Sequence, residues 1–404
     1  MQEAGGGQKE ASIVAANFDL AVSPGENFYL YSNGGWIART EIPPEYPSWN
    51  TFVALRDLNL SRLKEMLEGL ACGTEASGDE AEEHVGAFYR ACMDEAAIEA
   101  QGLASPQFSR LAEIAFTLAP TDAVAAVAAV HAEFSTILFG FYSSPDKKDS
   151  SNTIATLSQG GLGLPDRDYY CEDAKADKRA KYLEYITALL QLVGAHAGST
   201  FPQYTTAEAC SSAAQQVFDL EMELAQSHFT RTQCRDPHLT YNKMGPTQVG
   251  VGSGFDFVKY LALMGKPVES LNVAMPAAVT AAAKITASPS FGHYIVFHVV
   301  SGLAKHLSSP FVALHFDFFQ KCLQGTSELK PRWKQAMDHL DAAISDQVAR
   351  LYVRKHFSEQ AKAQALVIVD HVKAALRERL GEIQWMSAPT KLRAFEKVWT
   401  GLPP

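Results

Sequence analysis

The fold class is decided by residues 335–351, which have the sequence QAMDHLDAAISDQVARL. Apolar side chains recur there at intervals of three or four residues, the spacing of one face of an α-helix. A second helix is expected directly afterwards, capped by Ser358 and closed by Gly381, because serine favours helix starts and glycine favours helix ends. This part of the chain is therefore predicted to be helical. The apolar residues of the first helix are Met337, Leu340, Ile344, Val348 and Leu351.

The same spacing extends through most of the remaining chain. Strand signals are few and weak, at residues 137–142 and 153–157. No period of about 20–50 residues recurs, which argues against a solenoid. The predicted fold class is mostly α, a multi-helix lobe. Further helices are predicted over residues 50–73, 80–100, 121–134, 177–193 and 207–227, and a last helix from about Ser387, with Pro389 in its first turn.

The composition is typical of a globular protein with two or three lobes. The chain has 404 residues, whereas a domain typically has about 150. Hydrophobic residues make up 47% and charged residues 20% of the chain, which excludes disorder throughout. The formal net charge is −10, and no basic run occurs. Binding to nucleic-acid backbones or to anionic membrane surfaces is therefore not expected, since both need clustered Lys and Arg.

The N-terminal region and the cysteines bear on the cellular compartment. Residues 1–16 are predicted to form a flexible tail, without the apolar segment of a secretory signal. Residues 17–50, rich in aromatics, glycine and proline, are predicted to form turns and short extended pieces. None of the six cysteines forms a C-x-x-C pair, which favours free thiols. Because no run of about 20 apolar residues occurs, we expect no membrane span and a soluble, cytoplasmic protein.

No catalytic motif is visible in the sequence. None of the 12 histidines is followed by Glu, which excludes the zinc motif H-E-x-x-H. His293 and His298 would lie about 140° apart around a helix, so they are interpreted as buried or solvated helix residues rather than metal ligands. No G-x-S-x-G nucleophile turn occurs. The sequence GVGSG at 250–254 matches neither phosphate-binding pattern and is predicted to be a flexible loop.

Several strings of residues are nevertheless distinctive. In this order and spacing, over about residues 17–397, they resemble the N-terminal region of the neprilysin and endothelin-converting-enzyme family of zinc metalloendopeptidases. The GLGLPDRDYY and YNKM strings are the most specific of them. The strings are FYLYSNGGW at 28–36, IP at 42–43, SWNTF at 48–52, LRD at 55–57, GGLGLPDRDYY at 160–170, RDP at 235–237, YNKM at 241–244, LYV at 351–353 and WM at 385–386.

The resemblance implies a mostly α fold of two lobes, in which a helical lid lobe restricts entry to peptides. In the complete family enzyme, which is often membrane-anchored or secreted, the other lobe holds zinc on H-E-x-x-H and a downstream Glu. No zinc is expected in this chain, because it is expected to end before that lobe. The implied segments are residues 17–50 (extended and turn-rich), 51–381 (helical lobe), 382–397 (start of the connection to the catalytic lobe) and 398–404 (divergent tail).

The resemblance also suggests three residues for substrate contact. Phe52 and Arg56 match positions that line the family's substrate chamber, and their spacing of four would place them on one helix face. Ser48 occupies the position where neprilysin-type members place an Arg that holds the substrate's C-terminal carboxylate. In the alternative interpretation, Phe52 is a core residue and Arg56 is a surface residue paired with Asp57 or a neighbour. No catalytic or metal-binding residue is predicted.

Three functions are compatible with the sequence. The first is the substrate-gating region of a neprilysin-like metalloendopeptidase, inactive alone. The second is a non-catalytic peptide-binding or regulatory module, and the third is one half of a split peptidase. Peptides are the expected ligands, and a homo-oligomer or a partner that supplies the catalytic lobe is the expected assembly. Without that lobe, seven apolar residues should be incompletely buried: Trp36, Ile37, Trp49, Trp385, Met386, Phe395 and Trp399.

We predict that the purified chain neither binds zinc stoichiometrically nor cleaves peptides. Catalytic zinc needs three protein ligands within tetrahedral reach, and the sequence offers no motif that supplies them. Metal analysis and a cleavage assay with a bradykinin-like peptide check this expectation. One tightly held zinc per chain, together with chelator-sensitive cleavage, would contradict it.

Overall fold

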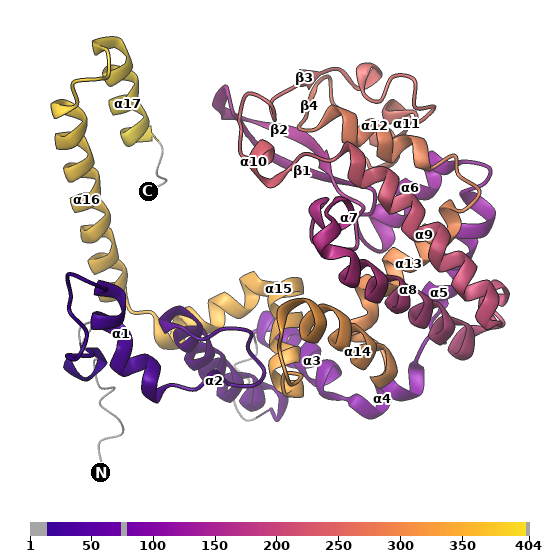
Figure 1. The fold of residues 1–404 in the computed structure, drawn as a ribbon, viewed down its shortest axis with the longest axis horizontal. Coiled ribbons are helices and arrows are strands. Elements are labelled where there is room, and N and C mark those ends of the chain that lie inside the picture. The colour runs from indigo at the N-terminus through magenta and orange to yellow at the C-terminus, as the bar shows by residue number, and fades with distance from the viewer. Residues whose placement is uncertain (1–13, 74–78, 401–404) are drawn as a thin grey trace. The chain divides into compact units, whose positions relative to one another are not determined.

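The computed structural model describes residues 14–73 and 79–400, and it confirms a mostly α fold (Figure 1). These residues form two compact units. Unit 1 contains residues 14–49 and 95–329, and unit 2 contains residues 50–73, 79–94 and 330–400. Each unit has its own hydrophobic cluster. The segment boundaries suggested by the family resemblance stay predictions.

Unit 1 holds most of the elements and the only sheet among the described residues. Its α-helices are α1 (Phe28–Arg39), α4 (Glu95–Gln101), α5 (Pro106–Glu113), α6 (Ala123–Glu133), α7 (Asp168–Cys171), α8 (Ala176–Ala197), α9 (Ala207–Ser227), α10 (Arg231–Cys234), α11 (Phe257–Leu263), α12 (Pro276–Ile285), α13 (Phe291–Leu303) and α14 (Ser309–His315). Its short helices are η1 (Ala15–Asn17), η2 (Ile114–Leu118), η3 (Asp173–Lys175), η4 (Pro202–Tyr204), η5 (Pro246–Gln248), η6 (Ala304–His306) and η7 (Phe316–Cys322).

The sheet has four strands in the order β1-β2-β4-β3. Strands β1 (Phe139–Asp146) and β2 (Asp149–Gln159) form an antiparallel hairpin, which confirms both weak strand signals of the sequence. Strand β4 (Leu271–Val273) pairs in parallel with β2, and β3 (Lys243–Met244) pairs antiparallel with β4. Helix α12, which follows β4, packs against β2. The sheet is therefore assembled from segments that lie more than a hundred residues apart.

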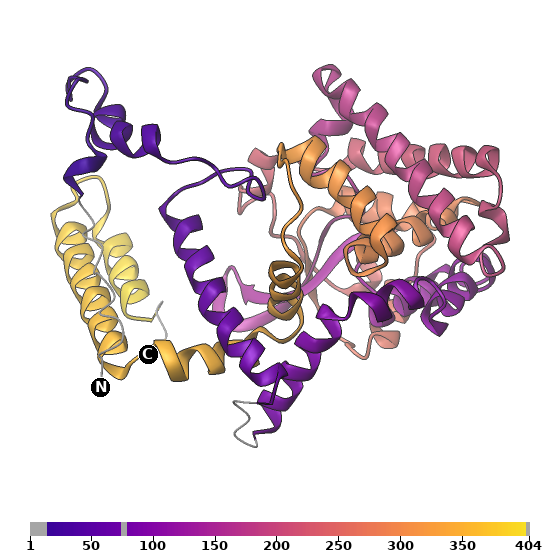
Figure 2. The same cartoon turned by 90° about the horizontal axis from the view of Figure 1, so that it is seen from below.

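Unit 2 consists of helices drawn from the two ends of the chain. They are α2 (Thr51–Ala71), α3 (Glu80–Met93), α15 (Arg332–His356), α16 (Glu359–Glu382) and α17 (Ala388–Thr400). Helices α2, α3 and α15 pack together around one cluster that includes Leu67, Val85, Tyr89 and Leu340. Helix α17 folds back beside α16 in both views (Figures 1 and 2).

The buried carboxyl group of Glu221 on α9 organises the centre of unit 1. It accepts hydrogen bonds from the hydroxyls of Tyr170 at 2.6 Å and Tyr182 at 2.9 Å. Nε2 of His298 lies 2.8 Å from its Oε1, although this contact lacks hydrogen-bond geometry. Burial and the charge of Glu221 raise the pKa of both tyrosines well above 10, so they stay neutral donors. One side chain thus links helices α7, α8, α9 and α13.

Capping residues set the ends of several predicted helices. The side chain of Asn50 accepts from the Val53 amide at the start of α2, and Ser358 accepts from the Ala361 amide at the start of α16. Three details differ from the sequence prediction. Helix α16 continues through Gly381 to Glu382, with Ile383 as its C-cap. Asp122, rather than its neighbour Thr121, caps α6, and the helix predicted over 80–100 is broken at Asp94, whose ψ of 74° is not helical.

The prediction of turns and extended pieces for FYLYSNGGW was wrong, because residues 28–39 form helix α1. Asn27 caps this helix by accepting from the Leu30 amide. The two glycines, which suggested a turn, are needed for close packing instead. A methyl group on Gly35 would overlap the carbonyl oxygen of Ala16, in the preceding η1 segment. Glycine here is explained by a tertiary contact rather than by backbone conformation.

The exposed apolar side chains agree with the expectation of incomplete burial. Ile37 and Trp385 are exposed, and Trp36, Trp49, Met386 and Phe395 are half-buried. Trp399 lies outside the residues whose side chains are described. Within the described chain, no single helix is long and apolar enough to cross a membrane, and only the bent pair Phe291–His306 and Ser309–Cys322 passes that test jointly.

We predict that Glu221→Ala destabilises unit 1 by about 3 kcal/mol or more, because it leaves two buried tyrosine hydroxyls without their acceptor. Glu223→Ala on the same helix is the matched control, since Glu223 is exposed and should change stability by less than about 0.5 kcal/mol. Urea unfolding followed by circular dichroism measures both variants. Equal effects of the two substitutions would rule out a central role for Glu221.

We also predict that stability falls as the pH drops below about 6.5. Burial lowers the pKa of His131, His228 and His315 to about 4, so the unfolded chain binds more protons than the folded chain between these values. Urea midpoints between pH 6.5 and 5 report the effect. His131→Gln should make the dependence shallower, and a flat profile of the unmodified protein would contradict the account.

Candidate functional site

A groove in unit 2 between α2 and α15 contains two of the three residues suggested for substrate contact. Its volume is about 330 Å³. The buried lining residues form an apolar floor, and charged or amide groups stand among the other lining residues; the floor consists of Leu60, Met337, Leu340 and Val348. Helix α2 contributes Phe52, Leu55, Arg56, Asn59, Leu60 and Leu63, and α15 contributes Met337, Asp338, Leu340, Asp341 and Val348.

The lining follows from the local sequence of each helix. On α2 the contributing residues recur at intervals of three and four, so they share one face, as the spacing of Phe52 and Arg56 predicted. Helix α15 leaves helical geometry at Ile344 (φ −140°, ψ 38°), between the lining residues Asp341 and Val348. The groove therefore lies where α15 bends.

Phe52 is not a core residue. Its side chain is 85% exposed at the first turn of α2, although phenylalanine is usually buried. This excludes the alternative interpretation in which Phe52 belongs to the hydrophobic core. An exposed aromatic ring above an apolar floor is the type of surface that contacts another molecule.

Arg56 is paired, but not with its neighbour in sequence. Its Nη2 lies 3.3 Å from Oδ1 of Asp338 on α15, and the other oxygen of Asp338 accepts from Nζ of Lys330 at 2.5 Å. Asp57 is bound instead by the buried ammonium group of Lys334. Because the Arg56 side chain remains 63% exposed, its other N–H donors point to solvent or to a ligand.

Hydrogen bonds hold the two walls of the groove in register. The Tyr352 hydroxyl on α15 donates to Oδ1 of Asn59 on α2 at 2.9 Å. Nη1 of Arg62, one turn further along α2, donates to the Tyr352 hydroxyl at 3.4 Å. Together with the Arg56–Asp338 pair, these contacts fix one face of α2 against α15.

Ser48 is not among the residues that line the groove. It is exposed and lies in the non-helical segment before α2. The structure thus brings together Phe52 and Arg56 in unit 2, whereas Ser48 belongs to unit 1. The substrate-contact roles of all three stay predictions.

The described residues do not match a zinc site. Among residues 14–73 and 79–400, no three His, Cys, Asp or Glu side chains gather as a metal site would require. His293 and His298 have other partners, since Nδ1 of His293 lies 2.9 Å from the Tyr204 hydroxyl and His298 contacts Glu221. All six cysteines are unpaired. We therefore assign no zinc-dependent step to these residues.

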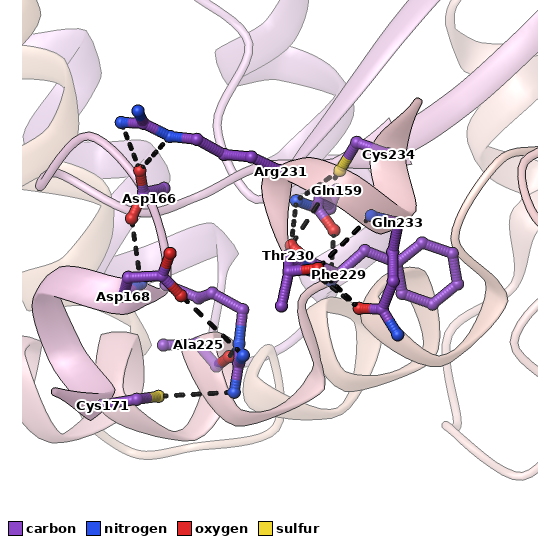
Figure 3. Close-up of polar contacts among 11 residues, drawn as sticks. Gln159, Asp166, Asp168, Cys171, Ala225, Phe229, Thr230, Arg231, Gln233 and Cys234 are labelled. Atoms are coloured by element: carbon purple, nitrogen blue, oxygen red, sulfur yellow. Dashed lines mark hydrogen bonds and ion pairs between the residues drawn. The ribbon is translucent and has the colours of Figure 1, made fainter. Parts of the chain in front are cut away.

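The GGLGLPDRDYY string has a structural role in unit 1. Gly163 has no room for a side chain, because a methyl group there would overlap the Tyr182 hydroxyl. Asp166 pairs with Arg231 of α10, at 2.5 Å to Nη2, and it also accepts from the Asp168 amide (Figure 3). The string therefore connects the end of β2 to α10 and to the Glu221 cluster.

A second tether in the same region uses Gln159, the last residue of β2. Its side-chain oxygen Oε1 accepts from the Phe229 backbone amide at 2.7 Å, and its side-chain nitrogen Nε2 donates to the Phe229 backbone carbonyl oxygen at 3.3 Å (Figure 3). Its amide group also lies 3.6 Å from Sγ of Cys234. These contacts tie the end of β2 to the segment between α9 and α10, next to the distinctive string.

The family model of peptidase family M13 matches residues 24–400. The chain therefore belongs to peptidase family M13, as its resemblance to the neprilysin and endothelin-converting enzymes indicated. Endothelin-converting enzyme 1 of Bos taurus is 28% identical over 406 residues, which cover 96% of this chain and 52% of that protein. Endothelin-converting enzyme-like 1 of Mus musculus is 27% identical over 423 residues, with 96% and 51% covered. The chain thus spans about half the length of these relatives.

Solved structures agree with this assignment. The inhibitor-bound zinc metalloprotease ZMP1 of Mycobacterium tuberculosis is 27% identical and superposes with a TM-score of 0.85, covering 96% of this chain and 58% of that one. PEPO of Lactobacillus rhamnosis HN001 has a TM-score of 0.78 at 19% identity, with 92% and 58% covered, and supports the fold alone.

The sequence did not reveal Asp338 and Asp341 as lining residues. The apolar stripe from Met337 to Leu351 predicted a buried helix face, and Asp338 and Asp341 flank that stripe. The sequence did not indicate that this helix pairs with α2. The nearest available signal was the two aspartates three residues apart, which must share a side of the helix.

Proposed function

We propose that this chain is the substrate-gating region of a metalloendopeptidase and is inactive without a zinc-binding lobe. The observation that supports this function is the groove, where an exposed Phe52 stands above an apolar floor beside the Arg56 guanidinium. An apolar peptide side chain would enter the groove. The free donors of Arg56 would bind a backbone carbonyl of the peptide, because guanidinium groups donate in several directions.

The exposed apolar residues of α16 support the expectation of a partner or of a second copy. Leu366, Val367, Ile368, Val369 and Val372 are all exposed, and four of them are consecutive, so they surround the helix. An exposed apolar turn in a helix that is otherwise rich in charged residues usually marks a contact surface. We therefore propose that another polypeptide segment covers α16. The cytoplasmic location stays a prediction.

The groove proposal is tested by binding of a fluorescently labelled peptide of about ten residues to the full chain. The peptide carries one central leucine, has no charged residues and has both ends blocked, since a terminal carboxylate is not required. Phe52→Ala should weaken binding about fivefold or more, because truncating an aromatic contact at an interface costs more than about 1 kcal/mol.

Phe28→Ala is the matched control, since Phe28 is another exposed phenylalanine, at the start of α1. It should leave the affinity unchanged. Fluorescence anisotropy measures the affinity of all three proteins. Equal affinities of the unmodified and Phe52→Ala proteins, or no binding at all, would exclude this groove as a peptide site.

A further inference from the structure

Some charged side chains of the groove have a partner of opposite charge, and one does not. The cationic group of Arg56 already has a carboxylate partner in Asp338, which Lys330 also binds. Asp341 differs from them. It lies three residues after Asp338, it is exposed and it lines the groove, yet it has no hydrogen bond or ion pair with any other described residue.

An unpaired carboxylate beside an apolar floor determines which ligands fit. A peptide carboxylate placed here would be repelled by Asp341, and it would find Arg56 already paired with Asp338. A Lys or Arg side chain would supply the missing counter-charge of Asp341 while its aliphatic stem lies on the floor. One cationic residue, Arg56, and two anionic residues, Asp338 and Asp341, line the groove. The lining residues therefore carry a net charge of −1.

We propose that Asp341 is a specificity residue that selects peptides with a Lys or Arg beside the apolar side chain in the groove. The inference rests on the proposed peptide-binding function. Asp341 binds the cationic group, Phe52 and the floor bind the apolar side chain, and Arg56 is left to bind a backbone carbonyl. The expected occupant is thus an apolar–basic segment rather than an acidic one or a free C-terminus.

The test uses three labelled peptides, blocked at both ends, that differ only in the residue next to the central leucine: Lys, Gln or Glu. The unmodified full chain should bind the Lys peptide about two- to fivefold more tightly than the Gln peptide, the range for an exposed ion pair. The Glu peptide should bind most weakly. The preference should shrink at 0.5 M salt, about where exposed charges are largely screened.

Asp341→Asn should reduce the Lys-to-Gln preference to about one without abolishing binding. Asp346→Asn, an exposed aspartate on the same helix outside the groove, is the matched control and should retain the preference. If the unmodified chain binds all three peptides equally, or binds the Glu peptide best, the role of Asp341 is wrong while the peptide site stands. If it binds none of them, the proposed function fails and the inference fails with it.

Discussion

The carboxyl group of Glu221 is the interaction on which unit 1 depends most. It is fully buried and accepts hydrogen bonds from two tyrosine hydroxyls, one on α7 and one on α8. His298 of α13 also lies against it. A buried acidic group is costly unless its partners are in place, so these helices must assemble together. The glycine at 163 is part of the same constraint, since it leaves the space that the Tyr182 hydroxyl occupies. Two residues of the most distinctive string, Gly163 and Tyr170, are thus explained by packing around one polar group.

Unit 2 depends on a different constraint, the pairing of two helices from opposite ends of the chain. The Arg56–Asp338 and Asn59–Tyr352 contacts join residues more than 280 positions apart, and the two helices share one hydrophobic cluster. The groove is formed by this pairing, since each helix alone would present only an amphipathic face. Its apolar floor and its partly compensated charges are the features on which the proposed peptide site rests.

Local signals allowed most elements of the fold to be predicted. Asn50 and Ser358 cap the helices that they were expected to cap, and both weak strand signals became the β1–β2 hairpin. Helix α1 was missed because its glycines serve a tertiary contact, which no local rule detects. For the site, the spacing of Phe52 and Arg56 indicated a shared face, but Asp341 could not be found from the sequence. Its importance depends on which helix lies opposite and on which neighbouring charges are already paired.

The central claim is that peptides contact this chain in the α2–α15 groove. A peptide carrying a photoreactive benzoylphenylalanine in place of its apolar residue tests this claim most directly, with cross-linked sites identified by mass spectrometry. The account predicts cross-links within residues 52–63 and 337–348, suppressed by excess unlabelled peptide. Competable cross-links confined to unit 1, for instance around Tyr185 and Phe318, would contradict it.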